Sequence, residues 1–131
     1  MSPRQSSGVS AVAIAPDGLT AISASLDKTL KIWDTETGRE LKTLTGHRAV
    51  TAVAIAPDGL TAISASEDRT LKIWDLLTGK EVASFSGDSV FNGCAFAPDG
   101  VTVVAGDDSG RVHFLRLEGM GDLGDAAGKL I

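Results

Sequence analysis

Short runs of apolar and β-branched residues alternate with polar turns along most of the chain. In the middle of the sequence four such runs occupy residues 50–56, 60–66, 70–75 and 80–86. Each run has the length of an ordinary strand and is bounded by residues that favour turns. The pattern predicts four short strands connected in sequence by tight turns.

The turns between these runs have recognisable chemistry. Pro57-Asp58-Gly59 predicts a turn because proline presets φ, aspartate bonds to nearby backbone and glycine accepts a positive φ. Thr78-Gly79 marks a second turn, and residues 67–69 mark a third. Short turns join antiparallel strands, so the four runs predict one small antiparallel sheet.

The first run is apolar at successive positions. Val50, Ala52 and Ala54 are expected on one face of the strand, with Val53 and Ile55 on the other. A strand with two apolar faces is buried on both sides. We therefore expect other layers of the protein to cover both faces of this sheet.

The whole unit is repeated with an offset of 41 residues. The string AVAIAPDGLTAISAS occupies residues 11–25 and again residues 52–66, and Pro-Asp-Gly returns at 98–100. Trp33 corresponds to Trp74, but the third copy has Leu115 at that position. A four-stranded unit with a period of about 40–45 residues is typical of a β-propeller blade.

Several motifs in register resemble those of the WD-repeat β-propeller family. They are Gly46-His47, Pro57-Asp58-Gly59, Ser64-x-Ser66-x-Asp68 and Trp74-Asp75, and the resemblance covers residues 9–117. The ending GRVHFLRLEG is similar to the last blade of propellers that close bacterial multidomain signalling proteins.

The resemblance implies an all-β fold of antiparallel four-stranded blades at residues 9–45, 50–86 and 90–117. The third blade is expected to have three strands, because its fourth would fall near residues 121–127, which lack β-branched residues. This gives about 2.75 blades, with an N-terminal extension at residues 1–8 and a flexible tail at residues 118–131.

The resemblance also implies a buried hydrogen-bond network in each blade. The second blade has His47, Ser64, Asp68 and Trp74 for this network. The first blade retains three of the four, with Ser6 in place of histidine, and the third retains none. The first-blade members are Ser23, Asp27 and Trp33, and the third-blade replacements are Asp88, Ala105, Ser109 and Leu115.

In this family, partners usually dock on the face formed by the loops around the conserved His and Asp. Five positions on that face differ between otherwise similar copies, and they form the candidate partner-binding face. They are Leu26, Arg48, Glu67, Ser89 and Asp108.

Composition narrows the function classes. The formal charge is −5 over 131 residues, and basic residues are scattered singly, which argues against a nucleic-acid partner. No apolar run has membrane-spanning length, and residues 1–10 lack the apolar core of a signal peptide. The single cysteine, Cys94, excludes an internal disulfide and is expected in the core. We expect a cytoplasmic protein with no membrane partner.

Candidate chemistry is sparse. The repeated Asp-Gly pairs and the GDDSG segment at residues 106–110 follow the repeated turns, and no calcium-loop spacing follows them. His113 takes the place of Lys31 and Lys72, which predicts a surface residue. An enzyme would have to use carboxylates such as Asp99 or Asp108. We predict no catalytic residue, no metal and no cofactor.

The leading hypothesis is a non-catalytic scaffold or protein-interaction module. Closed propellers typically have about four to eight blades, so an arc of fewer than three would expose apolar sheet faces. The alternative is a self-assembling partial propeller (a fragment, a relic or an engineered chain) whose main partner is itself. A dimer would have six blades and a trimer nine.

Overall fold

The computed structural model describes residues 8–45, 48–118 and 129–130. They form three four-stranded antiparallel sheets, each in simple sequence order. Sheet 1 contains β1 (Val9–Ile14), β2 (Thr20–Ser25), β3 (Thr29–Asp34) and β4 (Glu40–Thr45). Sheet 2 contains β5 (Val50–Ile55), β6 (Thr61–Ser66), β7 (Thr70–Asp75) and β8 (Lys80–Ser86). Sheet 3 contains β9 (Phe91–Phe96), β10 (Thr102–Asp107), β11 (Val112–Glu118) and β12 (Lys129–Leu130).

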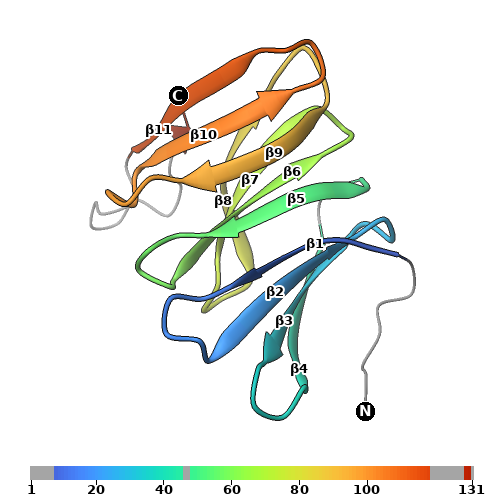
Figure 1. Ribbon diagram of the computed structural model, residues 1–131, viewed down its shortest axis with the longest axis vertical. Helices are drawn as coiled ribbons and strands as arrows, with labels where there is room; N and C mark the ends of the chain where they lie inside the picture. Colours follow the sequence, from blue (N-terminus) through green and yellow to red (C-terminus); the bar gives the residue numbers. More distant parts are fainter. Residues whose placement is uncertain (1–7, 46–47, 119–128, 131) are drawn as a thin grey trace.

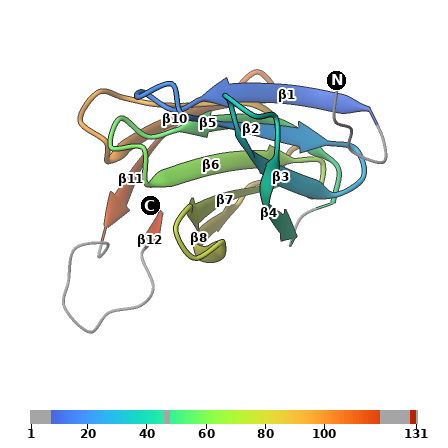
Figure 2. The same ribbon diagram turned by 90° about the horizontal axis from the view of Figure 1, so that it is seen from below.

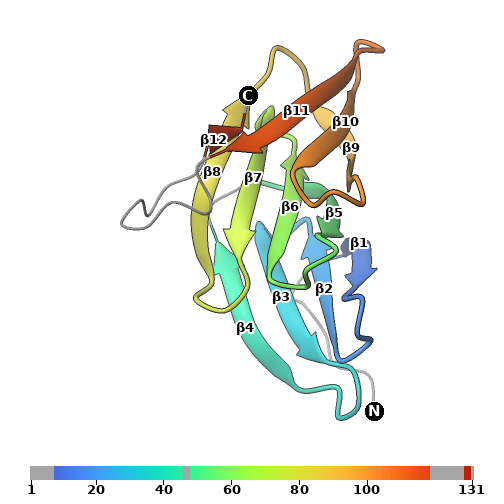
Figure 3. The same cartoon turned by 90° about the vertical axis from the view of Figure 1, so that its left-hand side faces the viewer.

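The three sheets follow one another in chain order, with sheet 2 between sheets 1 and 3 (Figure 1). Their first strands, β1, β5 and β9, lie along one side of the molecule, and β4, β8 and β12 lie along the other (Figure 3). Seen from below, sheet 2 lies between the other two (Figure 2). The predicted all-β architecture of repeated antiparallel sheets is therefore confirmed.

Two apolar cores join consecutive sheets. The first lies between sheets 1 and 2 and includes Ile22, Leu30, Val53 and Trp74. The second lies between sheets 2 and 3 and includes Ile63, Leu71, Phe91, Val103 and Leu115. Both faces of sheet 2 are covered, and all six residues of β6 are buried. Sheets 1 and 3 each have one face outside these cores.

The face assignment of Val50 was wrong by one step. Val50 pairs with Ser66 and Ala52 pairs with Ala65, so Thr51 forms a bulge in β5. A bulge inserts one extra residue and shifts the alternation of side chains. Val50 therefore joins Val53 in the core with sheet 1, whereas Ala52 packs toward sheet 3.

The expectation of a three-stranded third blade was also wrong. Leu117 pairs with Leu130, and Glu118 with Lys129, which gives sheet 3 a short fourth strand. The predicted location near residues 121–127 lies outside the described residues, as do most of the predicted N-terminal extension and tail. Leu130 is buried in the core with sheet 2, because its apolar side chain extends the covered face of sheet 3.

The aspartate of each Trp-Asp pair orders the turn into the fourth strand. Asp34 Oδ1 accepts the backbone N–H of Glu36 at 2.8 Å, and Asp75 Oδ1 accepts that of Leu77 at 2.9 Å. Such aspartate turns substitute a carboxylate for a backbone acceptor. The third copy has Arg116 here, which has no acceptor oxygen in its side chain. The position that supplies a side-chain acceptor to this turn in sheets 1 and 2 therefore supplies none in sheet 3.

The turns between the second and third strands contain a strained position. Lys28 has φ 74° and Arg69 has φ 69°, which places both in the left-handed region. The third copy has Gly110 at the corresponding position, with φ 92°. Glycine adopts this conformation without the steric penalty that a Cβ imposes. The degenerate third copy has therefore relieved a strain that the two close copies retain.

We predict that Arg69→Gly raises the free energy of unfolding by about 0.5–1 kcal/mol, because relief of left-handed strain exceeds the added entropy of the unfolded chain. Urea unfolding measures the change. The control is Lys80→Gly, at an exposed strand position without a positive φ, which should lower stability. Equal losses in both variants would contradict the assignment of strain to Arg69.

Candidate interaction surfaces

The two tryptophans make matching hydrogen bonds within their sheets. Trp33 Nε1 donates to Ser23 Oγ, and Trp74 Nε1 donates to Ser64 Oγ, each at 2.8 Å. Trp74 and Ser64 are both buried, whereas Trp33 is half-buried on the open face of sheet 1. A buried indole N–H needs an acceptor, and the serine on the neighbouring strand supplies one.

The aspartates at positions 27 and 68 hold the turns that follow β2 and β6. Asp68 Oδ1 accepts the backbone N–H of Thr70 at 2.9 Å and also its hydroxyl, and Asp27 makes the same two bonds to Thr29. The structure thus brings together Trp with Ser, and Asp with Thr. The proposed fourth member of the network, His47, lies outside the described residues, so the complete network stays a prediction.

The same turns present three different side chains from one repeated backbone position. The backbone N–H groups of Leu26, Glu67 and Asp108 donate to the carbonyls of Gly8, Ala49 and Val90 at 3.0–3.1 Å. All three of these turn side chains are exposed. Identical backbone bonds therefore hold an apolar residue and two acidic residues at equivalent places.

The two remaining members of the candidate partner-binding face differ in exposure. Arg48 is exposed, and its backbone N–H lies 3.5 Å from Asp68 Oδ2. Ser89 is half-buried. Arg48 therefore lies beside the turn that contains Glu67, whereas Ser89 offers less accessible surface.

The prediction that His113 is a surface residue was wrong. His113 Nε2 lies 2.8 Å from Asp107 Oδ2, and only 18% of its side chain is exposed. Its ring packs edge-on against Phe91, with the ring centroids 5.1 Å apart. The cause is a coordinated change, since Asp107 replaces Ser66 and His113 replaces Lys72. Sequence comparison of the copies could have shown this exchange, because both positions lie on paired strands.

Asp107 is also the acceptor that orders the last tight turn. Its Oδ1 accepts the hydroxyl of Ser109 at 2.6 Å and the backbone N–H groups of Ser109 and Arg111 at 2.9 and 3.2 Å. The hydroxyl of Ser109, His113 and these N–H groups hold the pKa of the Asp107 carboxyl well below its usual range. Sheet 3 therefore has its own carboxylate that holds the turn. It is at position 107, whereas the repeat alignment with Asp27 and Asp68 would put it at position 109, which is a serine.

The two carboxylates considered for catalysis, Asp99 and Asp108, both accept hydrogen bonds from neighbouring groups of the fold. Asp99 accepts the Thr102 hydroxyl at 2.7 Å and backbone N–H groups of Thr102 and Val101, which lowers its pKa. Asp108 accepts the side-chain amide of Asn92 at 2.5 Å. The two lie in the turns at opposite ends of β10, and they do not form an acid–base pair.

Cys94 packs beside the core between sheets 2 and 3. Burial raises the pKa of its thiol to about 12, so the thiol remains protonated at neutral pH. No cluster of three or more His, Cys, Asp or Glu suited to a metal occurs among the described residues. No helix in that part of the chain is long and apolar enough to cross a membrane.

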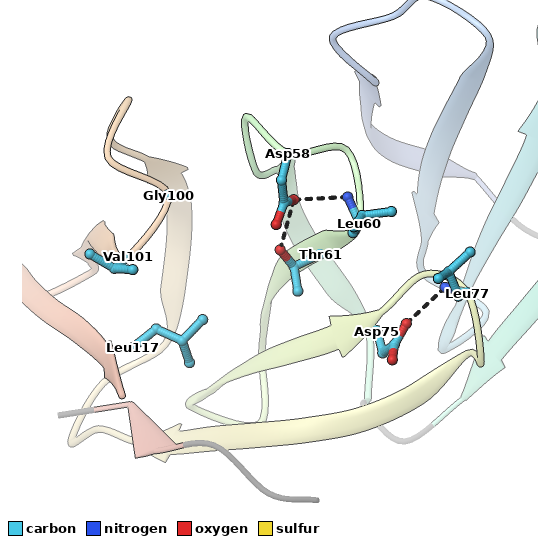
Figure 4. A pocket seen from close by; sticks show the side chains of 8 residues that line it. All are labelled: Asp58, Leu60, Thr61, Asp75, Leu77, Gly100, Val101 and Leu117. Atoms are coloured by element: carbon cyan, nitrogen blue, oxygen red, sulfur yellow. Dashed lines mark hydrogen bonds between the residues drawn. The ribbon is translucent and has the colours of Figure 1, made fainter. Parts of the chain in front are cut away.

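A cavity of about 360 Å³ opens between sheets 2 and 3 at the edge with the Pro-Asp-Gly turns (Figure 4). Its lining includes Leu60, Leu77, Val101 and Leu117. Its carboxylates serve the neighbouring turns, since Asp58 Oδ1 accepts from Leu60 N at 2.8 Å and Asp75 Oδ1 from Leu77 N at 2.9 Å. The cavity is therefore an apolar gap between turns, at the edge opposite the candidate partner-binding face.

These features define a protein built from repeated four-stranded sheets with tryptophan and aspartate at fixed positions. The family described as "WD domain, G-beta repeat" matches residues 3–34, 38–75 and 79–114. The chain therefore belongs to the WD-repeat family. Each of the last two matched segments runs from the turn before a fourth strand to the third strand of the next sheet.

The chain is also similar to part of "Dynein assembly factor with WD repeat domains 1". The identity is 51% over 39 residues for the Homo sapiens protein and 54% over 39 residues for that of Danio rerio. In both cases the match covers 30% of this chain and 9% of the relative. The similarity is confined to about one repeat.

We predict that Asp107 makes sheet 3 sensitive to acid. Its folded pKa lies below the unfolded value of about 3.9, so its stabilising contribution is complete above that value and is lost as pH falls toward the folded pKa. Urea unfolding from pH 6 to pH 3 should show a smaller acid-dependent loss for Asp107→Asn than for the wild type.

The control for this measurement is Asp88→Asn. Asp88 is exposed, and its 3.4 Å surface pair with Arg111 contributes little. Asp88→Asn should retain the acid dependence of the wild type. An Asp107→Asn variant with an unchanged pH profile would contradict the role assigned to Asp107.

Proposed function

We propose that this chain is a non-catalytic protein-interaction module that binds partners through the turns between the second and third strands. One observation carries the proposal. The same backbone hydrogen bond fixes Leu26, Glu67 and Asp108 in place, yet their exposed side chains differ, and Leu26 and Glu67 differ between two copies that are otherwise nearly identical. A rigid frame with variable exposed loops is a common arrangement for recognition.

The chemistry of this face suits a protein surface of mixed character. Leu26 offers an apolar contact with 51% of its surface exposed, Glu67 and Asp108 offer acceptors, and Arg48 offers donors. WD-repeat proteins generally mediate protein interactions, and the relatives are named as an assembly factor. We propose a cytoplasmic location, which suits a chain whose single cysteine, Cys94, can form no internal disulfide.

The test compares the amount of partner protein captured by the purified wild-type chain with the amount captured by a triple variant. The triple variant carries Leu26→Ala, Glu67→Ala and Asp108→Ala. We expect the recovered amount of a specific partner to fall at least about tenfold, because side-chain contacts are lost while backbone bonds remain. The matched control replaces Leu19 and Leu60, exposed leucines of the opposite edge, with alanine. If the control variant loses partner binding and the triple variant retains it, the partner docks on the edge with Leu19 and Leu60, and the proposal is wrong.

A second candidate function is self-assembly into a closed ring, either a dimer of six sheets or a trimer of nine. It is supported by large apolar side chains exposed on both end sheets, among them Val12 on β1 and Phe114 on β11. Exposed apolar patches of this kind mark interaction surfaces. In this account the turn face remains free to bind partners, because it lies at the edge of the sheets.

A further inference from the structure

Each internal contact between sheets joins two different faces. The outgoing face of a sheet points toward the next sheet, and the incoming face points toward the preceding one. The outgoing face consists of Ile22, Ala24, Leu30 and Ile32 in sheet 1 and of Ile63, Ala65, Leu71 and Ile73 in sheet 2. The incoming face consists of Val50, Val53, Ala62 and Trp74 in sheet 2 and of Phe91, Cys94, Val103 and Leu115 in sheet 3.

Sheet 1 leaves its incoming face open. The residues that correspond to those of sheet 2 are Val9, Val12, Ala21 and Trp33, and they are identical in type at all four positions. Val53 is 9% exposed, whereas its counterpart Val12 is 69% exposed. The open face of sheet 1 therefore has the composition of a face that, in sheet 2, packs against an outgoing face.

Sheet 3 leaves its outgoing face open. The residues at the corresponding positions are Val104, Gly106, Val112 and Phe114. Phe114 is 73% exposed, whereas its counterpart Ile73 is fully buried. Three positions are smaller than in sheet 2 and one is larger, so the face stays apolar with a changed shape.

The two open faces are therefore opposite halves of one type of interface. Sheet 1 lies at one end of the row of sheets and sheet 3 at the other (Figure 1). Two copies joined incoming to incoming would place Trp33 against Trp33, a pairing that occurs in neither internal core. Joining outgoing to incoming repeats the arrangement found twice within the chain and generates a ring when the rotation closes.

A polar contact repeats along the same direction. The Ser10 hydroxyl donates to the carbonyl of Val50 in the next sheet, and the Thr51 hydroxyl donates to that of Phe91 at 2.6 Å. The third copy has Asn92 at this position. Asn92 gives one amide N–H to Asp108, and its second donor is available for the Val9 carbonyl of a following copy.

We propose that the open outgoing face of sheet 3 binds the open incoming face of sheet 1 in a second copy of this chain, head to tail. The inference rests on the self-assembly proposed above and adds its direction and its contacts. Phe114 is the central apolar anchor, and Val12 and Trp33 form the surface that receives it.

The first test compares single-face variants by light scattering and native mass spectrometry. The wild type should have two or three times the 13.5 kDa of one chain. Val12→Glu and Phe114→Arg should each weaken association by more than about 100-fold, because each buries a charge without a partner. The matched control is Leu77→Glu, where a leucine 68% exposed lies off both open faces and should leave the mass unchanged.

The second test mixes the two variants. Val12→Glu retains an intact outgoing face, and Phe114→Arg retains an intact incoming face. A mixed dimer has one wild-type contact and one Glu–Arg contact, so head-to-tail assembly predicts that association recovers on mixing. Because both substituted side chains are exposed in the single chain, circular dichroism of each variant should match that of the wild type.

Each possible mass has a different meaning for the assembly. A wild-type chain with the mass of one copy would refute self-assembly, and the open faces would then belong to another protein or to further blades. An assembled wild type whose two variants do not recover on mixing would leave self-assembly standing but refute the head-to-tail contact. Recovery on mixing would support both, and neither result depends on docking at the turn face.

Discussion

The packing of one sheet against the next is the interaction on which this structure depends. A single four-stranded sheet with two apolar faces cannot shield both of them, so each sheet is stable only when neighbours cover it. Sheet 2 meets this condition on both sides, as the full burial of β6 shows. Sheets 1 and 3 meet it on one side only, which makes the covering of the remaining faces the central question about function.

The polar residues act within the frame that these faces set. In the Trp-Asp pair the two side chains have different tasks, since Trp74 bonds across to Ser64 on β6 while Asp75 orders the turn into β8. Loss of both in the third copy is accompanied by local replacements. Asp107 takes over the tight turn and pairs with His113, and a two-residue β12 completes the sheet. The frame therefore tolerates loss of its motif where the apolar faces are kept.

Much of the fold could be predicted from the sequence, because the 41-residue period is visible in it and the turn residues act locally. The positions of the strands and of the repeated turns follow from patterns within one copy, whereas the pairing of Trp with Ser was implied by the resemblance to the WD-repeat family. The bulge at Thr51 could not be predicted in the same way, since it depends on pairing between β5 and β6. The Asp107–His113 pair becomes visible only when the copies are compared position by position. The late fourth strand depends on pairing between β11 and β12, which a single run of residues does not reveal.

Identical residues of sheets 1 and 2 differ only in what covers them, and Trp33 and Trp74 report on this directly. Fluorine NMR of the chain labelled with 5-fluorotryptophan, assigned with Trp33→Phe, measures the solvent exposure of each indole. Phe114 lies in sheet 3, and sheet 2 separates it from Trp33 within one chain. Head-to-tail assembly predicts that Trp33 is shielded in the wild type and becomes exposed in Phe114→Arg, while Trp74 is unchanged. A Trp33 resonance that is equally exposed in both proteins would contradict it.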